Sequence, residues 1–322
     1  MSLSVGILFF MSNYKHLIFI ILETYFSHGK LLLTSEYFVL DGATALAIPT
    51  RLGQSLEVQD IDSSQDTIFW ETYREGQLWL KLVLNYQSLE IVETNLPEAA
   101  TFIQKVFKTL KDLKTEKLSG SQSYYLKSNV EFPENYGLGS SSTLMNNIAS
   151  WAKVDAFTLN DLALGGSGYD IAVAQQSAPI LYTRRGEQKE VKKVAFNPSF
   201  KDELIFVHLN RKQNSREGIS MYRSLEKEPS LIDYFTHLTD EVVKCNDLEK
   251  FSLLMLEHEV KMSDFLKIEI IKEKYFKDLP VFAKSLGAWG GDFILTRKFR
   301  GYKNYFQHKE YHTIIDFENL IY

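Results

Sequence analysis

The residues best suited to chemistry lie between positions 133 and 145, where a turn rich in glycine and serine follows a predicted strand. This segment reads PENYGLGSSSTLM and contains Gly137 and Gly139. Because glycine lacks a Cβ, the backbone of the turn can close on a ligand. A helix is predicted from Ser142 to Trp151, and the first amides of a helix have no intrahelical partner. Those amides, the positive helix end and the serine hydroxyls predict a phosphate-binding turn, whereas the simpler alternative is a capped helix start.

Two common phosphate-binding motifs do not describe this sequence. Gly29-Lys30 lacks the glycine that a P-loop carries five residues earlier, because Thr24 stands there, and Leu31 follows the lysine. The second glycine of the turn is followed by three serines, which a dinucleotide-binding fingerprint does not have. The turn therefore indicates another class of phosphate site.

Two further glycine-rich segments follow along the chain. The first reads GGSGYDIA from position 165, and Asp170 comes after its flexible turn and before an apolar helix face. That carboxylate either points into a cleft or stabilises the dipole of the helix from its first turn. The second reads SLGAWGGDFIL from Ser285 and bends sharply into a strand, so its backbone can approach a ligand or another segment. Taken alone, a plain bend between loop and strand is the simpler interpretation of this last segment.

Composition limits the classes of protein to which the chain can belong. The chain has 322 residues, which suggests about two domains, and 36 basic against 41 acidic residues give a net charge of −5. A mildly acidic chain without a long basic run is a poor non-specific nucleic-acid binder, so we predict no nucleic-acid partner. The fractions of apolar and charged residues, 45% and 24%, exclude wholesale disorder. The single cysteine, Cys245, cannot form an intramolecular disulfide, and we expect a cytoplasmic protein.

Residues 1–22 are apolar in two short bursts, Ile7–Met11 and Leu17–Leu22. A membrane-spanning helix needs about 20 mostly apolar residues, so neither burst is long enough and we predict no membrane partner. No positive charge precedes the first burst and no small-x-small cleavage site follows the second, which disfavours a signal peptide. We interpret the segment as a dispensable leader, or as sequence upstream of a start at Met11, with an extra edge strand as the alternative.

The rest of the chain mixes predicted strands and helices. Strands are expected at 30–33, 37–40, 46–48, 123–129, 180–183, 204–209 and 292–296, with further β-like alternation over 52–94. Helices are expected at 96–113, 142–151, 169–174, 215–225 and 231–263. A hairpin turn is expected at Asp41-Gly42, and the weakly patterned stretch 184–198 suggests a domain boundary near residue 186. Because strict βαβ alternation is absent, we predict an α+β fold.

The three glycine-rich segments, in this order and with GKLLL ahead of them at 29–33, resemble the motifs of the GHMP kinases. This superfamily includes galactokinase, homoserine kinase, mevalonate kinase and phosphomevalonate kinase. The resemblance runs from about residue 25 to about residue 296. It implies an N-terminal extension over 1–23, an N-terminal domain like domain 2 of ribosomal protein S5 over 24–186, and a ferredoxin-like C-terminal domain over 187–322. It also implies phosphoryl transfer from ATP, with Mg²⁺, to a small molecule in a cleft between the domains.

The resemblance assigns roles to single residues. Lys30 matches the lysine near the transferred phosphate, and Asp170 matches the catalytic aspartate that takes the acceptor's proton or orients its hydroxyl. Ser141 matches the serine that binds magnesium in mevalonate kinase. The nucleotide-binding positions are Pro133, Gly137, Leu138, Gly139, Ser140, Ser141, Ser142, Gly287, Ala288, Gly290 and Gly291. The substrate-binding positions are Glu36, Tyr37 and Ser215, and the neighbouring Arg216 is added to them as a candidate cation.

The sequence departs from its relatives at two positions. Trp289 stands where relatives usually have glycine, so the third glycine-rich segment must open differently or cover something flat. Leu159 stands where mevalonate kinases place a metal-binding glutamate, and the flanking Asp155 and Asp161 do not match that position. The second metal ligand therefore stays open.

The acceptor is indicated by short motifs only. Ser35-Glu36-Tyr37 and Gly290-Gly291-Asp292 resemble phosphomevalonate kinase more, whereas Gly168-Tyr169-Asp170 resembles mevalonate kinase as well. We therefore expect a mevalonate-pathway kinase, a monomer or homodimer, with a galactokinase-type sugar kinase or a non-catalytic ligand-binding protein as alternatives. A phosphorylated acceptor would need further cations, for which the candidates are Arg184, Arg185, Arg211, Lys212 and Arg216.

Two other groups of residues are interpreted as structural. Glu257-His258-Glu259 lies in a helical run and is predicted to be on the surface, and no zinc motif surrounds it. Cys245 is predicted to be a small packed residue rather than a nucleophile.

Overall fold

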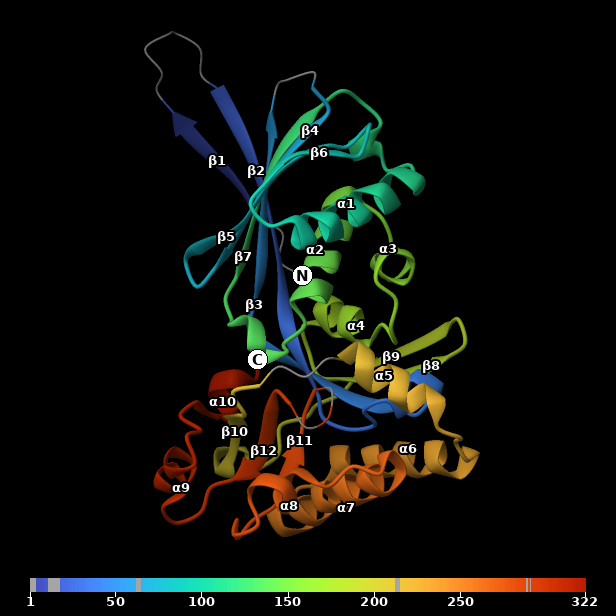
Figure 1. Cartoon of the computed structure of the whole chain (residues 1–322), viewed down its shortest axis with the longest axis vertical. Coiled ribbons are helices and arrows are strands. Elements are labelled where there is room, and N and C mark those ends of the chain that lie inside the picture. The colour runs from blue at the N-terminus through green and yellow to red at the C-terminus, as the bar shows by residue number, and fades with distance from the viewer. Residues whose placement is uncertain (1–3, 11–17, 62–64, 212–214, 288, 290) are drawn as a thin grey trace. The chain divides into compact units, whose positions relative to one another are not determined.

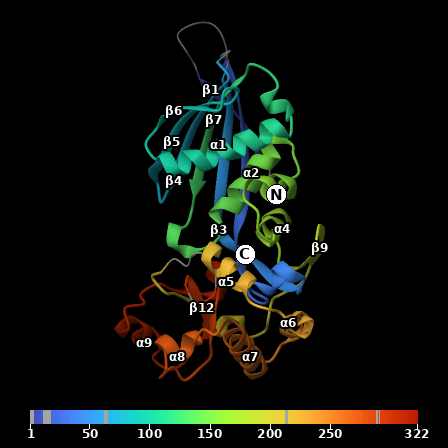
Figure 2. The same cartoon turned by 45° about the vertical axis from the view of Figure 1, so that its right-hand side comes forward.

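The structure of the protein is a computed structural model that describes residues 4–10, 18–61, 65–211, 215–287, 289 and 291–322. The chain divides into two compact units (Figures 1 and 2). The first unit comprises residues 1–29, 52–133 and 139–175, and the second comprises 30–51, 134–138 and 176–322. Both units are built from separate stretches of sequence, and the single boundary near residue 186 stays a prediction.

The first unit is built on a β-sheet. Its strands are β1 (Ser4–Phe10), β2 (Ile18–Leu32), β3 (Ala45–Ile61), β4 (Thr67–Arg74), β5 (Gln77–Asn85), β6 (Glu90–Thr94) and β7 (Ser123–Val130), and β2 and β3 also carry residues of the second unit. They follow the order β1-β2-β3-β7-β4-β5-β6, in which only β4 and β7 pair in parallel among the pairs with a described register. Buried and half-buried residues alternate along β7, as expected for a strand with one face on a core.

Helices cover one face of this sheet (Figure 1). They are α1 (Pro97–Asp112), α2 (Ser140–Ala152), α3 (Ala156–Ala163) and α4 (Tyr169–Gln176). Proline in the first turn suits the start of α1, and Ile103, Val106, Phe107 and Leu110 recur at helical spacing and are buried in the core. The predicted helix at 96–113 and the predicted strand at 123–129 are therefore confirmed.

The N-terminal segment takes part in the first sheet. β1 pairs with β2 in antiparallel register, from Ser4 opposite Thr24 to Phe10 opposite Ile18. This backbone arrangement is the extra edge strand that the sequence left as an alternative, and the dispensability of the segment stays a prediction. None of the helices that the structure describes is both long and apolar enough to cross a membrane.

The second unit contains a separate antiparallel sheet with the order β11-β12-β10-β13. Its strands are β10 (Leu204–His208), β11 (Ala283–Ser285), β12 (Phe293–Arg297) and β13 (Ile314–Asp316). The hairpin of β8 (Ile180–Arg185) and β9 (Gln188–Lys193) pairs with Ala45–Ala47 of β3. Helices of this unit are α5 (Ser215–Ser224), α6 (Pro229–Lys244), α7 (Leu248–Leu266), α8 (Ile271–Tyr275), α9 (Tyr302–His308) and α10 (Phe317–Leu320). This mixture of sheets and helices confirms the predicted α+β class.

The strand predicted at 37–40 and the hairpin turn predicted at Asp41-Gly42 were both wrong. Residues 37–40 form no strand, because the left-handed φ angles of Ser35 and Tyr37, 60° and 63°, turn the chain into a 3₁₀ helix at Phe38–Asp41 that ends at Gly42. The weakly patterned stretch 184–198 contains the strand β9, which the pattern did not indicate. Its residues are exposed or half-buried, so it shows no apolar alternation.

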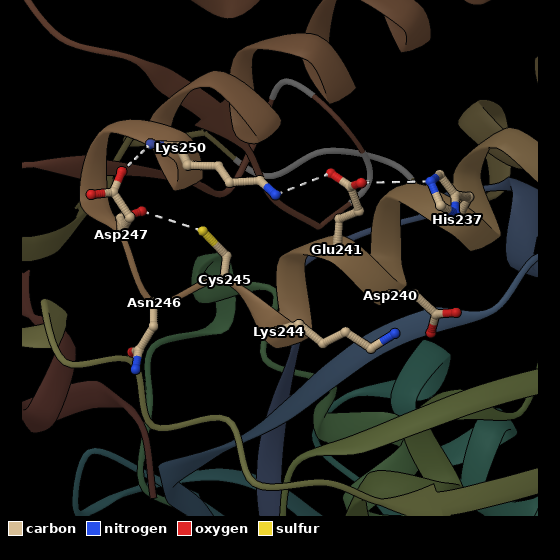
Figure 3. A pocket seen from close by; sticks show the side chains of 8 residues that line it. All are labelled: His237, Asp240, Glu241, Lys244, Cys245, Asn246, Asp247 and Lys250. Atoms are coloured by element: carbon tan, nitrogen blue, oxygen red, sulfur yellow. Dashed lines mark hydrogen bonds and ion pairs between the residues drawn. The ribbon is translucent and has the colours of Figure 1, made fainter.

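A shallow hollow of about 310 Å³ lies where α6 ends and α7 begins (Figure 3). Cys245 is buried there and its thiol donates to the Asp247 carbonyl at 3.3 Å. Glu241 lies 3.5 Å from His237 and 3.7 Å from Lys250, so the lining charges pair with one another. This geometry agrees with a packed cysteine.

Candidate functional site

The first part of the predicted phosphate turn meets Lys30 inside the second unit. The Lys30 amide donates to the Leu138 carbonyl at 3.0 Å, and its ammonium Nζ donates to the Gly137 carbonyl at 3.3 Å. Only 9% of Lys30 is exposed. Lys30 is thus joined to Leu138 through its main chain and to Gly137, 107 positions away in sequence, through its side chain, and its ammonium lies directly beside the glycine turn.

Asp292 brings the first and third glycine-rich segments together. A Cβ added to Gly137 or to Gly287 would overlap the Asp292 carboxylate, and the two glycines have left-handed φ angles of 65° and 74°. Only glycine adopts these left-handed φ angles readily and also leaves room for the Asp292 carboxylate. Asp292 is buried, and the sequence pointed to it only as a family marker rather than as a site residue.

Aromatic contacts fix the short 3₁₀ turn Glu134–Tyr136 that precedes Gly137. His208 on β10 shares a hydrogen bond of 3.0 Å with the Asn135 carbonyl. The Tyr136 ring lies 4.9 Å from the His208 ring and 5.1 Å from the Phe293 ring on β12. The start of the motif is therefore held against two strands of the second unit.

The continuation of the motif, in the first unit, leaves polar groups open to a ligand. Pro133 is half-buried after β7, and Gly139, with φ 85°, is the N-cap residue of α2 and has no side chain to satisfy its first amides. Across the described residues, the hydroxyls of Ser140, Ser141 and Ser142 make no hydrogen bond, and Ser141 is exposed. Backbone amides and free hydroxyls at a helix N-terminus suit phosphate oxygens and a magnesium ion.

A buried uncharged network holds α2 in place beneath this turn. Ser27 on β2 donates to Asn147 at 2.6 Å and accepts from Asn146 at 2.8 Å. Gln54 on β3 accepts from the Thr143 hydroxyl at 2.6 Å, and its carbonyl accepts from Asn147 at 2.8 Å. Each of these polar side chains is almost fully buried and hydrogen-bonded, so the helix start is fixed by directional contacts.

Comparison with solved structures shows which known proteins share the fold of this chain. No family model matches the sequence, and no curated protein does. Mevalonate kinase from Methanococcus jannaschii superposes with a TM-score of 0.64 and 16% identity, over 90% of this chain and 95% of that chain. Phosphomevalonate kinase from Streptococcus pneumoniae, in complex with phosphomevalonate and AMPPNP, gives 0.64 and 17% over 89% and 96%. Galactokinase from Lactococcus lactis, complexed with galactose, gives 0.59 and 15% over 89% and 88%.

This chain has the GHMP kinase fold. The resemblance based on the glycine-rich segments is thereby confirmed at the level of the fold. Sequence identities of 15–17% support a shared fold but do not identify the activity or the substrate of this chain.

In this GHMP kinase fold, Asp170 occupies the first turn of α4 in the first unit and is half-buried. Gly165, Gly166 and Gly168 before it have φ angles of 81°, 100° and 87°, a left-handed series that leads the chain into the helix. Lys30 belongs to the second unit, and its joint action with Asp170 stays a prediction.

Two of the positions considered for a second metal ligand, Leu159 and Asp155, have structural roles. Leu159 is fully buried in the apolar core of the first unit. The Asp155 carboxylate caps α3 by accepting from the Thr158 amide at 2.7 Å. In the described part of the chain, no three or more His, Cys, Asp or Glu side chains are grouped to hold a metal ion.

Two predicted substrate segments pack together within the second unit. The Tyr37 ring stacks on Tyr222 of α5 at 5.6 Å, and its hydroxyl would overlap a Cβ added to Gly218. Burial, with Glu36 and Asp292 nearby, raises the pKa of Tyr37 to about 12, so its hydroxyl stays protonated. α5 begins at Ser215, but the side chains of Ser215 and Arg216, like Ala288 and Gly290, lie outside the described residues, whereas Gly291 leads into β12.

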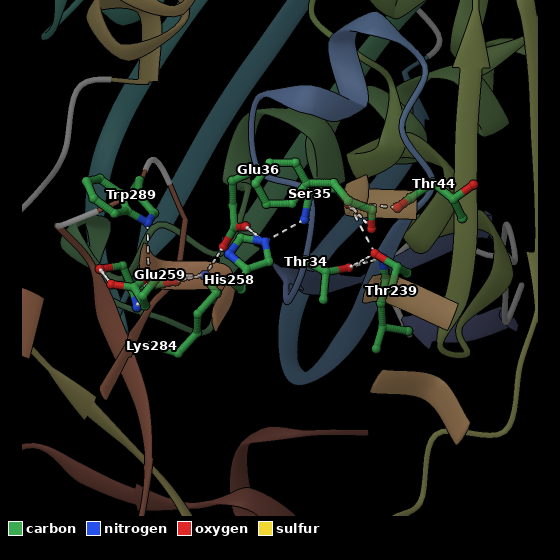
Figure 4. Close-up of polar contacts among 12 residues, drawn as sticks. Thr34, Ser35, Glu36, Thr44, Thr239, His258, Glu259, Lys284 and Trp289 are labelled. Atoms are coloured by element: carbon green, nitrogen blue, oxygen red, sulfur yellow. Dashed lines mark hydrogen bonds and ion pairs between the residues drawn. The ribbon is translucent and has the colours of Figure 1, made fainter. Parts of the chain in front are cut away.

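Glu36 belongs to a buried cluster of charged side chains (Figure 4). The cluster comprises Glu36, His258, Glu259 and Lys284, each at most 1% exposed. Lys284 donates to Glu36 and lies 3.5 Å from Glu259, while His258 Nε2 lies 3.0 Å from Glu36. The prediction that residues 257–259 lie on the surface was therefore wrong for His258 and Glu259, because partners far away in sequence bury them, and right for Glu257.

The cluster sets the protonation of its members. Burial raises the pKa of Glu36, but Lys284 and His258 outweigh it, so that pKa lies below its usual value. Burial, helped by Lys284, lowers the pKa of His258 in spite of Glu36. Its Nε2 then accepts from the Ser35 amide at 2.9 Å. Burial raises the pKa of Glu259, and Lys284 offsets this in part.

Proposed function

We propose that the protein is an ATP-dependent kinase that phosphorylates a small molecule. The observation that carries the proposal is the meeting of Lys30 with the glycine turn at Gly137 and Leu138, on a GHMP kinase fold. Phosphoryl transfer depends on positioning and charge neutralisation more than on covalent chemistry, and an ammonium beside a glycine turn supplies both.

We assign each residue a physical task. The open amides and hydroxyls at the start of α2 fit phosphate oxygens, and the exposed Ser141 hydroxyl fits as a ligand of Mg²⁺, which when bound neutralises phosphate charge. Lys30 attracts the developing negative charge at the transferred group. Asp170 accepts a hydrogen bond from the acceptor hydroxyl and orients it for attack.

The acceptor that we propose belongs to the mevalonate pathway, with phosphomevalonate ahead of mevalonate. The Ser-Glu-Tyr and Gly-Gly-Asp motifs support this choice, and the solved phosphomevalonate kinase and mevalonate kinase have the same fold. A sugar kinase is the second candidate, because a galactokinase complexed with galactose also shares the fold. Among the candidate cations, Arg211 is exposed and its guanidinium stacks on the Tyr275 ring at 4.6 Å. We would test Arg216 first for a phosphate contact, because it is next to Ser215 at the start of α5.

A coupled assay of ADP release with mevalonate, phosphomevalonate and galactose tests the proposal. We expect the highest kcat/KM with phosphomevalonate. Preference for mevalonate would keep the pathway but overturn the phosphorylated acceptor, and turnover of galactose alone would overturn both. No turnover with any of them, together with no binding of MgATP by calorimetry, would overturn the kinase itself.

Asp170→Asn should separate chemistry from folding. The substitution keeps the shape but removes the charge that orients the acceptor, so we expect kcat to fall by about 10²–10⁴-fold with MgATP affinity and melting temperature nearly unchanged. Lys30→Met should lower kcat by about 10²-fold or more. Asp155→Asn is the matched control, since asparagine caps α3 as well as aspartate does. Unchanged turnover in Asp170→Asn would remove it from the mechanism.

A further inference from the structure

Glu259 contacts the third glycine-rich turn, Ser285–Asp292, at its first residue and again at Trp289. Its carboxylate accepts from the Ser285 amide at 3.0 Å, from the Ser285 hydroxyl at 3.2 Å and from the Trp289 indole N–H at 2.9 Å (Figure 4). Ser285 ends β11, and Trp289 lies four residues further along the turn. One side chain of α7 therefore ties the turn to the body of the second unit.

The same turn leads to Asp292, whose carboxylate packs against Gly137 and Gly287. Asp292 follows Trp289 by three positions, so a contact that holds Trp289 restricts where that carboxylate can lie. A shift of the turn would move the Asp292 carboxylate away from Gly137. The Gly137 carbonyl is the group that accepts from the Lys30 ammonium, so the space beside that contact would open. The contact of Glu259 with the turn thus extends, through Asp292, to the residues that we propose bind the nucleotide phosphates.

Burying this carboxylate is costly, and stability alone does not account for it. Glu259 has no exposed surface, and buried ion clusters contribute little to stability compared with apolar packing of similar volume. Trp289 belongs to the buried apolar cluster that also contains Tyr37 and Phe38, and its indole N–H donates to Glu259. The buried carboxylate is thus matched by a buried donor from the glycine-rich turn, so the contact specifies the position of the turn.

We propose that Glu259 is a positioning residue for nucleotide binding, which acts by fixing the Ser285–Asp292 turn through Ser285 and Trp289. The proposal rests on the proposed kinase function. It places Glu259 outside the reacting groups, because its three hydrogen bonds are all made to the turn. It therefore predicts effects on nucleotide affinity rather than on the chemical step.

The test compares Trp289→Phe and Glu259→Gln with the full-length wild type, by MgADP calorimetry and by KM for ATP against kcat. Trp289→Phe removes one hydrogen bond to the carboxylate, and Glu259→Gln replaces the charged acceptor of all three by a neutral one, so we expect nucleotide affinity to fall about ten-fold with kcat within about two-fold of the wild type. The double variant should lose less than the sum of the two single losses, because both single variants weaken the contact between Trp289 and Glu259. Trp70→Phe is the matched control, since Trp70 is equally buried and donates to Thr72 at 2.8 Å in the other unit.

The outcomes separate the two proposals. Nucleotide affinity that is unchanged in Trp289→Phe, while the wild type binds MgADP, overturns the positioning role alone. An equal loss of affinity in Trp70→Phe overturns it as well, because general loosening would then explain the effect. A wild type that neither binds MgADP nor turns over any acceptor overturns the kinase function and, with it, the task of Glu259.

Discussion

Each of the two units contains a glycine-rich turn that buried polar side chains hold in place, but these side chains are neutral in one unit and charged in the other. At the start of α2 in the first unit they are hydroxyls and amides, and Ser27 bonds to two of the amides. At the third glycine-rich turn in the second unit they are ions, and Lys284 lies between Glu36 and Glu259. An uncharged network loses one or two hydrogen bonds when a member is removed, whereas an ionic cluster also loses its charge balance. The two regions should therefore differ in how they tolerate substitution.

Lys284→Met should have the largest effect. It leaves two carboxylates without their cation inside the protein, and we expect the free energy of unfolding to fall by about 3–5 kcal/mol in urea denaturation. Lys284→Met combined with Glu259→Gln should recover part of this loss, because one uncompensated charge is removed. A loss below about 1 kcal/mol in the single variant would contradict the comparison.

Ser27→Ala should have a smaller effect. It removes the acceptor of Asn146 and the donor to Asn147 but leaves no unpaired ion, so we expect a loss of about 1–3 kcal/mol in the same measurement. Ser88→Ala, on an exposed turn of the same unit, is the control for a serine hydroxyl outside the buried network. A loss in Ser27→Ala as large as that of Lys284→Met would remove the distinction between the two networks.

His258, which belongs to the second unit, should make the stability of the protein depend on pH. Its pKa is lowered in the folded protein, so the unfolded chain takes up a proton first as the pH falls below about 6.5. The contribution of His258 is thus present above that pH and is lost on acidification, by at most about 1.4 kcal/mol per pH unit. Urea denaturation at pH 7.5 and 5.5 should show a smaller difference between wild type and His258→Gln at the lower pH.

The opposite trend for His258→Gln would indicate a raised pKa and a protonated ring. Glu259 changes the stability of the protein with pH in the opposite sense to His258. Its pKa is raised in the folded protein, which therefore keeps a proton that the unfolded chain releases above about pH 4.5, so its contribution is present at low pH and is lost as the pH rises. Ser27→Ala is the matched control here, since no titratable group belongs to its network. Its loss of stability should be the same at both pH values.

The sequence predicted those parts of the molecule that depend on local pattern. The helix at α1 and the strand at β7 follow from the spacing of apolar residues, and the left-handed backbone at Gly137 and Gly139 follows from the choice of glycine, whereas phosphate binding by this turn stays a prediction. The 3₁₀ helix after Tyr37 was missed because Ser35 and Tyr37 take left-handed angles without being glycine. Such angles are imposed by surrounding contacts, which a sequence does not display.

The buried charges were missed for a related reason. A histidine and two glutamates in a helical run look like a solvated face, and only partners 223 and 26 positions away, Ser35 and Ser285, make two of them interior residues. Charged residues are rarely buried unless they are paired, and the sequence does not show the pairs, so it gives no basis for predicting that His258 and Glu259 are buried. Asp292 was noticed as part of a motif, but its contact with Gly137 depends on tertiary structure.

Trp289 has a consequence beyond positioning. The chain has four tryptophans, and Trp70, Trp79 and Trp151 all belong to the first unit. Trp289 is the single indole of the second unit, with its N–H on a carboxylate and its ring in an aromatic cluster. If the other three are replaced by phenylalanine, the tryptophan fluorescence of the protein, excited selectively over its 17 tyrosines, comes from this turn alone. The emission wavelength and quenching of one native fluorophore would then follow the turn in real time during rapid mixing with nucleotide, without any attached dye.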